Sequence, residues 1–296
     1  MIDEYKIKDR ILLESVQSKM DNIYASALGR QKLSLGYPLN QKFDYTAIAP
    51  FLNLHLNNVG DPYASSSTLL NTHELEQETL DYFAKLWHAT PRTPLIPDSF
   101  WGYVLVMGAT EGNMYALWSA CEYFQVRHGE SSRHPILYFS PETHYSIEKC
   151  AKIVGIETFQ KMGNQYYPGQ CPITEDGHWP NDVPVDKHGA IDPESLSTLV
   201  NFFTANGYPS IIVLNLGTTF RGAFDDPQIV WQNLSQLFDR DSYHRQTNRL
   251  GNKDLWIHID GALGAAYLPY LEIAFENVVA QTRSDSYRLF IQYLSG

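Results

Sequence analysis

The feature of this sequence that most constrains its fold is the alternation of short apolar runs with segments of helical periodicity. Strand-like runs occupy residues 101–107 (WGYVLVM), 135–140 (PILYFS), 210–217 (SIIVLNLG) and 255–260 (LWIHID). Short apolar strands separated by amphipathic helices are typical of a sheet that is covered on both faces. The order therefore predicts an α/β fold with a doubly wound, mainly parallel sheet.

Helical periodicity is clearest in two segments. In residues 111–124 one stripe holds Met114, Leu117, Cys121 and Phe124, and in residues 144–156 one stripe holds Ile147, Cys150, Ala151 and Val154. Further helices are expected over residues 3–27, within 69–87 and near 227–238, whereas residues 162–190 are rich in Gly and Pro. We expect two parts, an N-terminal helical segment (residues 1–35) and one large domain (residues 36–296).

Composition excludes several classes of protein. A net charge of −11 without a cluster of Lys and Arg argues against nucleic-acid binding. No apolar run approaches the roughly 20 residues that span a bilayer, and MIDEYKIKDR is no signal peptide. The three cysteines lack CxxC spacing, which fits reduced structural thiols. We therefore expect a cytoplasmic protein with no metal site, no membrane contact and no nucleic-acid partner.

The ends of the four expected strands are the places where a ligand should bind, because ligands of such sheets gather beyond the carboxyl ends of the strands. The first end carries GATEGN (residues 108–113), where Gly108 and Gly112 permit tight backbone geometry and Thr110 offers a hydroxyl. Free N–H groups at a helix start can hold a phosphate. The alternative is a Gly-rich turn without a ligand. The motif matches neither GxGxxG nor GxxxxGK[ST], which disfavours a dinucleotide or a nucleoside triphosphate.

The second and third strand ends carry an imidazole and two hydroxyls. His144 could stack on an aromatic ring or transfer protons, or it could be a helix cap or a surface residue. Thr218 and Thr219 could reach a ligand or simply close a turn. Asp225 and Asp226 are expected to cap the helix that follows.

The fourth strand end is Asp260, which is followed by Gly261 and Ala262. This carboxylate could face a cation, or it could accept hydrogen bonds from nearby backbone N–H groups. The four ends together offer an anion site, a flat imidazole, hydroxyls and a carboxylate. Pyridoxal phosphate needs this set, because it carries a phosphate, an aromatic ring, a phenolic oxygen and a pyridine nitrogen that must stay protonated.

Seven stretches of the sequence match one family in the family's order. They are GYPLNQKFDY, LHLNNVGDPY, LLNTHELEQETLDYFAKLW, WGYVLVMGATEGN, PETHYSIEKCAKIVGI, LNLGTTFRGAFDD and WIHIDGALGAAYLPY, and they cover most of residues 36–270. The chain resembles the pyridoxal-phosphate-dependent group II amino-acid decarboxylases, and within them the bacterial histidine decarboxylases. The plant serine decarboxylases are similar. The resemblance implies the fold of a fold-type-I pyridoxal-phosphate enzyme.

The resemblance also implies a role for each matching residue. The phosphate would be held by Gly108, Ala109, Thr110 and Asn113, with Thr218 and Thr219 near the ring and phosphate. His144 would stack over the ring and lie beside the substrate, and Ala262 would pack on the other face. Asp260 would pair with the ring nitrogen, so that His144 and Asp260 are the catalytic residues. Asn58 would help to shape the substrate end.

The activity implied by the resemblance is decarboxylation of an amino acid, with L-histidine giving histamine and carbon dioxide. The alternative within the family is serine or another amino acid. Family members are typically homodimers, so we expect a homodimer for the full-length form.

One departure from the family concerns the lysine that carries the cofactor as a Schiff base. The family's Ser-x-His-Lys motif is absent, and no lysine follows Lys253. FIQYLSG at the end faintly resembles the approach to that motif, which places the lysine within roughly ten residues beyond Gly296. We therefore expect a large domain that is incomplete at its C-terminus, lacks the family's small domain and is impaired in activity. The alternative is a non-catalytic remnant.

Overall fold

The computed structural model describes residues 2–34, 44–93, 95–96, 99–129, 133–242, 254–270 and 273–274. The chain divides into two compact units, residues 1–57 and 58–296, and each is described by itself. The expected boundary between residues 35 and 36 lies outside the described residues and stays a prediction. The same holds for the sequence from 275 to 296, where the family match fades.

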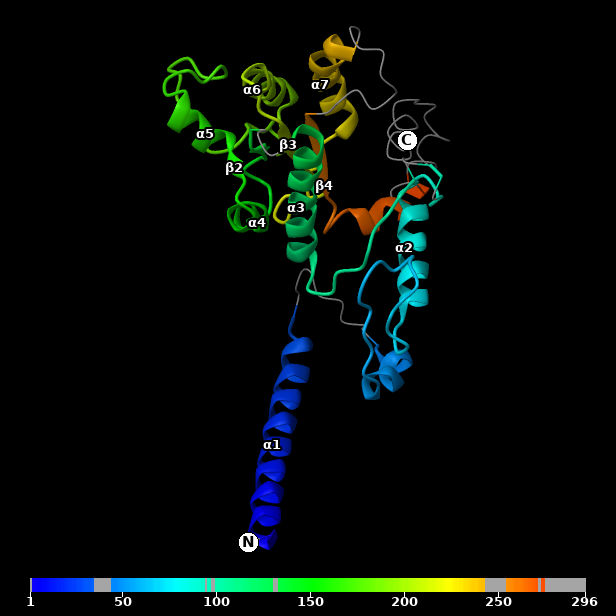
Figure 1. The fold of residues 1–296 in the computed structure, drawn as a ribbon. Coiled ribbons are helices and arrows are strands. Elements are labelled where there is room, and N and C mark those ends of the chain that lie inside the picture. The colour runs from blue at the N-terminus through cyan, green and yellow to red at the C-terminus, as the bar shows by residue number, and fades with distance from the viewer. Residues whose placement is uncertain are drawn as a thin grey trace. The chain divides into compact units, whose positions relative to one another are not determined.

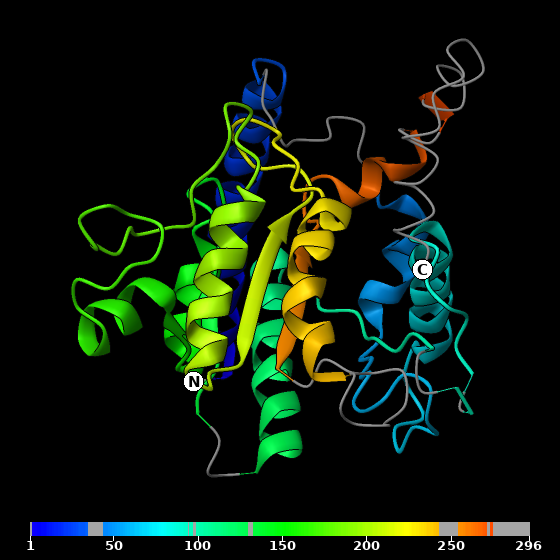
Figure 2. The same ribbon diagram turned by 90° about the horizontal axis from the view of Figure 1, so that it is seen from above.

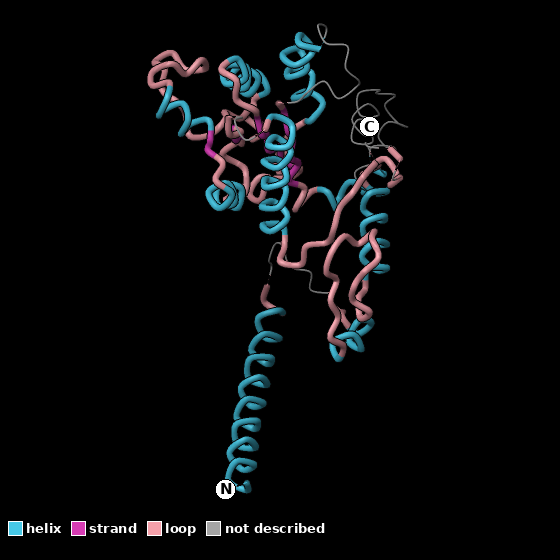
Figure 3. The backbone as a smooth tube through the Cα atoms, viewed as in Figure 1, coloured by secondary structure: helices cyan, strands magenta, loops and turns pink. Residues whose placement is uncertain are grey.

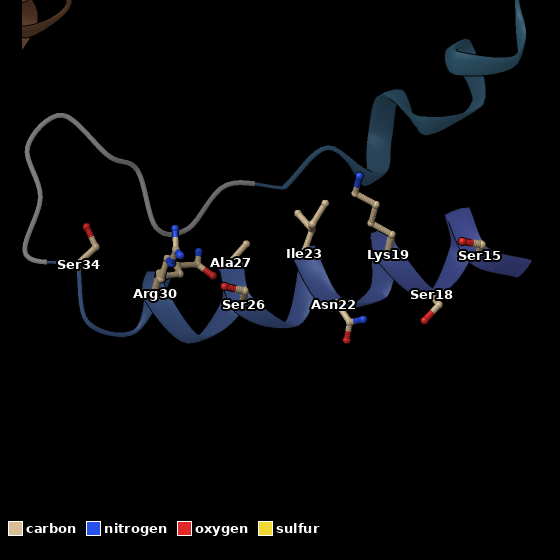
Figure 4. A pocket seen from close by; sticks show the side chains of 10 residues that line it. Ser15, Ser18, Lys19, Asn22, Ile23, Ser26, Ala27, Arg30 and Ser34 are labelled. Carbon is tan, nitrogen blue, oxygen red and sulfur yellow. The ribbon is translucent and has the colours of Figure 1, made fainter. Parts of the chain in front are cut away.

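In its described residues, the first unit contains a long helix and a 3-10 helix. Helix α1 (Ile2–Gln31) contains the helix expected over residues 3–27, and η1 spans Thr46–Asn53. A hollow of about 910 Å³ runs along α1 and is lined by residues of that helix and of the turn after it, from Ser15 to Ser34 (Figure 4). None of the strand-end residues contributes to this hollow, so it is not the candidate functional site.

The second unit is built on a four-stranded sheet (Figure 1). The strands are β1 (Ile136–Tyr138), β2 (Glu157–Thr158), β3 (Ser210–Asn215) and β4 (Leu255–Asp260). Their order is β2-β1-β3-β4, and all three neighbouring pairs are parallel. The parallel α/β sheet is therefore confirmed, and three of the four expected apolar runs contain a strand of it.

Six helices of the described residues accompany this sheet. They are α2 (His73–Leu86), α3 (Ala109–His128), α4 (Ser146–Val154), α5 (Phe159–Tyr166), α6 (Pro193–Ala205) and α7 (Pro227–Ser242), with a short 3-10 helix, η2, at Ala265–Tyr267. Sequence patterns did not indicate α5 and α6. The start of α6 has a clear local cause, because the Asp192 carboxylate accepts the Ser195 N–H (3.0 Å) and Pro193 occupies the first turn.

All residues of β1 and β3 are buried, whereas β2 and β4 are partly exposed. Alternate residues of β1 and β3 point to opposite faces. One core cluster joins Tyr138 and Ile212 to α5, α6 and α7, and the other joins Leu137 and Val213 to α3 and α4. Figure 2 shows α6 and α7 on one side of β3 and β4, with α3 on the other. The sheet is therefore doubly wound, as expected.

The expected strand at residues 101–107 is wrong. This segment runs as a loop between α2 and α3 (Figure 3), and it pairs with no described strand. The Val104 N–H donates instead to Glu76 Oε1 (3.0 Å), and Val106 and Met107 are exposed. An apolar run shows that a segment can form a strand, but a strand also needs a neighbour for its hydrogen bonds.

No described helix combines the length and the apolar character needed to cross a bilayer. Within the same residues, no group of three or more His, Cys, Asp or Glu side chains is arranged to hold a metal ion.

Candidate functional site

The candidate site lies at the carboxyl edge of the sheet, where the residues after β1, β3 and β4 meet. Because the strands are parallel, their carboxyl ends share one edge. Asn215, the last residue of β3, is in register with Asp260, the last residue of β4. The Leu216 N–H donates to the Asp260 carbonyl (2.9 Å) and continues the ladder. The chain therefore brings Asp260 beside the turn that follows β3.

Asp260 is a buried carboxylate with two neutral donors. Only 7% of the residue is exposed. Oδ1 accepts the Ala262 N–H (3.1 Å), and Oδ2 accepts the Asn113 side-chain amide (2.9 Å). No ion pair with Lys, Arg or His is found for it within the described part of the chain. A buried carboxylate without a cation carries an uncompensated charge, so Asp260 is suited to meet a cationic group of a ligand.

Asn113 lies on α3 and joins Asp260 to two further side chains. Its Oδ1 accepts a hydrogen bond from His258 Nε2 (2.8 Å), and its Nδ2 also reaches Ser146 Oγ (3.3 Å). Burial lowers the pKa of His258, although the nearby Asp260 charge raises it. His258 is therefore a neutral imidazole that donates from Nε2. The side chain of Asn113 is committed to these contacts, and only its backbone is left for the expected phosphate site.

His144 is half-buried at the start of α4. The Ser146 hydroxyl lies 2.8 Å from His144 Nδ1, and the Ser146 N–H donates to the same nitrogen (3.3 Å). Since Nδ1 accepts these bonds, the neutral ring carries its proton on Nε2. The Tyr145 ring lies 4.3 Å from the His144 ring, centroid to centroid. These two contacts with Ser146, the first residue of α4, fix the plane of the His144 ring.

The GATEGN segment forms the start of α3. Gly108 precedes the helix with φ of 90°, a conformation that favours glycine. Among the described residues no acceptor is found for the N–H groups of Ala109 and Thr110, the first two residues of α3. Free N–H groups and the positive end of the helix dipole suit an anion. The geometry is thus compatible with the expected phosphate site.

The two threonines after β3 differ in environment. Thr218 is buried, and its Oγ1 accepts the Ala223 N–H (2.9 Å), so it closes the turn from 218 to 223. Thr219 is exposed. The residues after Asp260 are small for a packing reason, because a Cβ at Gly264 would overlap the Leu216 carbonyl oxygen. Ala262, expected on a ring face, is exposed and contacts Asp260 through its N–H.

Asp226 caps α7 as expected, but Asp225 does not. Asp226 Oδ1 accepts the N–H groups of Gln228 (2.8 Å) and Ile229 (3.2 Å). The buried Asp225 accepts the N–H groups of Ile191 and Asn215 (2.7 Å each) and the Asn215 amide (2.8 Å). Burial raises the pKa of Asp225, and these donors lower it. The expectation for Asp225 was wrong because its partners lie on other elements.

The Asp225 cluster supports the loop that carries His144. The Asn215 amide donates to Thr143 Oγ1 (3.0 Å), the residue before His144. Sequence reasoning missed Asn215, Ser146 and His258. His258 had a detectable signal, because it precedes Asp260 by two residues and therefore shares its face of β4.

Asn58, expected near the substrate end, is tied to α2. Its Oδ1 accepts the Thr72 N–H (2.7 Å), and its Nδ2 donates to Glu76 Oε2 (3.0 Å). These contacts fix the 58–72 segment to the first turn of α2. None of them joins Asn58 to the residues at the carboxyl edge of the sheet.

Comparison with known proteins places this arrangement in a family. A family model described as the pyridoxal-dependent decarboxylase conserved domain matches residues 43–271. Histidine decarboxylase from Solanum lycopersicum is 30% identical over 277 residues, covering 92% of this chain and 54% of that protein. Serine decarboxylase 2 from Oryza sativa subsp. japonica is 30% identical over 245 residues, covering 83% and 42%.

Among solved structures, L-methionine decarboxylase from Streptomyces sp. 590, in its internal aldimine form, is similar to this chain. The identity is 37% and the TM-score 0.78, over 88% of this chain and 57% of that one. This likeness confirms the fold class of a fold-type-I pyridoxal-phosphate enzyme. The chain spans about half the length of the curated relatives that it matches. The resemblance seen in the motifs is confirmed: the chain belongs to the pyridoxal-dependent decarboxylase family.

Proposed function

We propose that this protein is a pyridoxal-phosphate-dependent amino-acid carboxy-lyase that converts L-histidine to histamine and carbon dioxide. The family supports the cofactor and the reaction type. Histidine decarboxylases from Solanum lycopersicum and Vibrio campbellii support the substrate, with 30% and 29% identity. Because the chain spans about half the length of these relatives, the activity is proposed for the whole protein.

The observation that carries the proposal is the uncompensated carboxylate of Asp260 at the end of β4. The residues of this site fit pyridoxal phosphate. Asp260 offers the negative charge that a protonated pyridine nitrogen needs, and the N–H groups of Ala109 and Thr110 offer donors to a phosphate. The His144 ring, held in its plane by Ser146, offers a flat surface for an aromatic ring.

Each of these residues has a defined task in the proposed reaction. When bound, the cofactor accepts the electron pair that remains on the substrate after carbon dioxide leaves. Asp260 keeps the ring nitrogen protonated by opposite charge, which that electron flow requires. The start of α3 binds the phosphate and so fixes the position of the ring relative to Asp260. His144 orients the ring and lies beside the substrate.

Serine and other amino acids are the alternative substrates, because relatives with other substrates are at least as similar as the histidine decarboxylases. The chain is 30% identical to a serine decarboxylase and 37% identical to a methionine decarboxylase. Carbon dioxide release by the full-length protein should be measured with L-histidine, L-serine and L-methionine in turn. We expect the highest kcat/KM for L-histidine. A higher kcat/KM for L-serine or L-methionine would show that this amino acid, and not L-histidine, is the substrate.

The anchoring lysine of the family is not among residues 254–296. For the chain of 296 residues alone, we propose that the cofactor binds through the non-covalent contacts described above. Borohydride treatment of this chain with pyridoxal phosphate, followed by mass spectrometry, should show no dominant lysine adduct. One stoichiometric adduct at a single lysine would show that another lysine replaces the family's.

The homodimer and the cytoplasmic location complete the proposal. They follow from the family resemblance and from the composition. Light scattering of the full-length protein during size exclusion should give twice the mass of one chain, and a monomer mass would exclude the homodimer. Cell fractionation should recover the protein in the cytosolic fraction.

A further inference from the structure

Five polar side chains at the carboxyl edge form one hydrogen-bonded chain with Asn113 at its centre. One arm runs from His258 Nε2 to Asn113 Oδ1 (2.8 Å) and from Asn113 Nδ2 to Asp260 Oδ2 (2.9 Å). The other arm runs from Asn113 Nδ2 to Ser146 Oγ (3.3 Å) and on to His144 Nδ1 (2.8 Å). The amide of Asn113 therefore connects Asp260 and His144, the two residues with proposed catalytic tasks.

The orientation of the Asn113 amide is fixed by its partners. A carboxylate only accepts hydrogen bonds, so the NH₂ group must face Asp260. Oδ1 then faces His258, which must donate from Nε2. Because burial lowers the pKa of His258, the ring stays neutral and carries its single proton on that nitrogen. Rotation of the amide would break both bonds, so His258 holds Asn113 in place.

The fixed amide in turn fixes the carboxylate. The terminal torsion of an aspartate is soft and has no sharp preferred value. In this chain the Asn113 amide binds one oxygen and the Ala262 N–H binds the other, at 2.9 and 3.1 Å. Charge-assisted hydrogen bonds depend strongly on direction, so the direction of the remaining lone pairs matters to any cation that Asp260 meets.

We infer that Asn113 is a positioning residue that holds the Asp260 carboxylate toward the pyridine nitrogen, and that His258 locks the Asn113 amide. This inference rests on the proposed function, because only pairing with a ring nitrogen requires this orientation. It gives Asn113, the last residue of GATEGN, a task at the ring nitrogen. The other residues of that motif keep theirs at the phosphate.

The test uses pyridoxamine 5′-phosphate and calorimetry on the 296-residue chain. This probe has the ring nitrogen and phosphate of the cofactor but no aldehyde, so it cannot form adducts with lysines. Asn113→Leu removes the amide and keeps the number and branching of the side-chain heavy atoms. The matched control is Asn206→Leu, where the lost amide bonds only the Phe202 carbonyl (2.8 Å) at the end of α6. We expect a Kd about tenfold weaker for Asn113→Leu and within about twofold of wild type for Asn206→Leu.

A second readout concerns His258 in the absence of any ligand. Its ring nitrogens, followed by ¹⁵N NMR, should show the Nε2–H tautomer in the wild type and a mixture of tautomers in Asn113→Leu. A packing role for Asn113 would leave the tautomer unchanged. If Asn113→Leu fails to fold by circular dichroism, Asn113→Asp replaces it, because it keeps the volume but puts a second carboxylate in place of the donor.

The outcomes separate this inference from the proposed function. If Asp260→Ala and Asn113→Leu each bind the probe more weakly and the His258 tautomer changes, the positioning role and the proposed function are both supported. Weaker binding by Asp260→Ala alone overturns the positioning role and leaves the proposed function standing. Unchanged binding by Asp260→Ala contradicts the proposed function itself.

Discussion

Asn113 and Asp260 are 147 residues apart in the sequence, and a 2.9 Å hydrogen bond joins their side chains. The bond connects α3, which begins at the expected phosphate site, to the end of β4, which carries the expected partner of the ring nitrogen. The two ends of one small cofactor would therefore be held by elements that are themselves bonded together.

Loss of the Asp225 carboxylate should destabilise the fold more than loss of the neighbouring Asp226. Asp225→Ala leaves the buried N–H groups of Ile191 and Asn215 without an acceptor, removes one of the acceptors of the Asn215 amide, and should cost about 3 kcal/mol of unfolding free energy. Asp226→Ala removes only the cap of α7 and should cost about 1 kcal/mol. Urea unfolding of both variants checks the order, and equal losses would show that the Asp225 bonds add nothing beyond a cap.

A methyl group added at Gly264 should lower the stability of the fold, whereas one added at Gly112 should raise it. Gly264→Ala drives a Cβ into the Leu216 carbonyl oxygen and should destabilise by at least about 2 kcal/mol. Gly112→Ala meets open space inside α3 and should stabilise by about 0.5–1 kcal/mol. Thermal unfolding measures both. A neutral Gly264→Ala would show that the turn after Asp260 can move away from β3.

Protonation of His258 should make the fold less stable in mild acid. Burial lowers its pKa in the folded state, whereas the unfolded chain has the ordinary value of 6.5. The unfolded chain therefore binds more protons below pH 6.5, and the His258 contribution to stability falls as the pH falls, by up to about 1.4 kcal/mol per pH unit. The unfolding free energy of the wild type should approach that of His258→Gln from above between pH 6.5 and 5. Parallel pH curves for the two proteins would contradict this.

The sequence pattern predicted those parts of the fold that depend on local periodicity. The runs at 135–140, 210–217 and 255–260 each contain a strand, and the full burial of β1 and β3 goes with a continuous apolar signature. The run at 101–107 has the same signature and forms no strand, since pairing depends on a partner elsewhere in the chain. Helix α5 was missed because its second half overlaps the start of the stretch rich in Gly and Pro at residues 162–190.

In the candidate site, too, local features could be predicted from the sequence and contacts between distant residues could not. Asp260 and His144 could be found because Asp260 ends one apolar strand and His144 lies six residues after the end of another. The contacts of Asp225 and Asn113 could not, because their partners are 10 to 147 residues away and depend on how the strands are ordered. Asp226 behaved as expected, since a helix cap is decided within three residues of the chain.

The protonation state of a bound pyridine nitrogen tests the central claim most directly. Pyridoxamine 5′-phosphate labelled with ¹⁵N in the ring should be bound to the wild-type chain and to Asp260→Asn, and its ring resonance followed by NMR at pH 8. The buried carboxylate of Asp260 should hold the ring nitrogen protonated in the wild type, whereas the neutral amide of the variant should leave it unprotonated. The same unprotonated resonance in both proteins would contradict the assignment of Asp260 as the partner of the ring nitrogen.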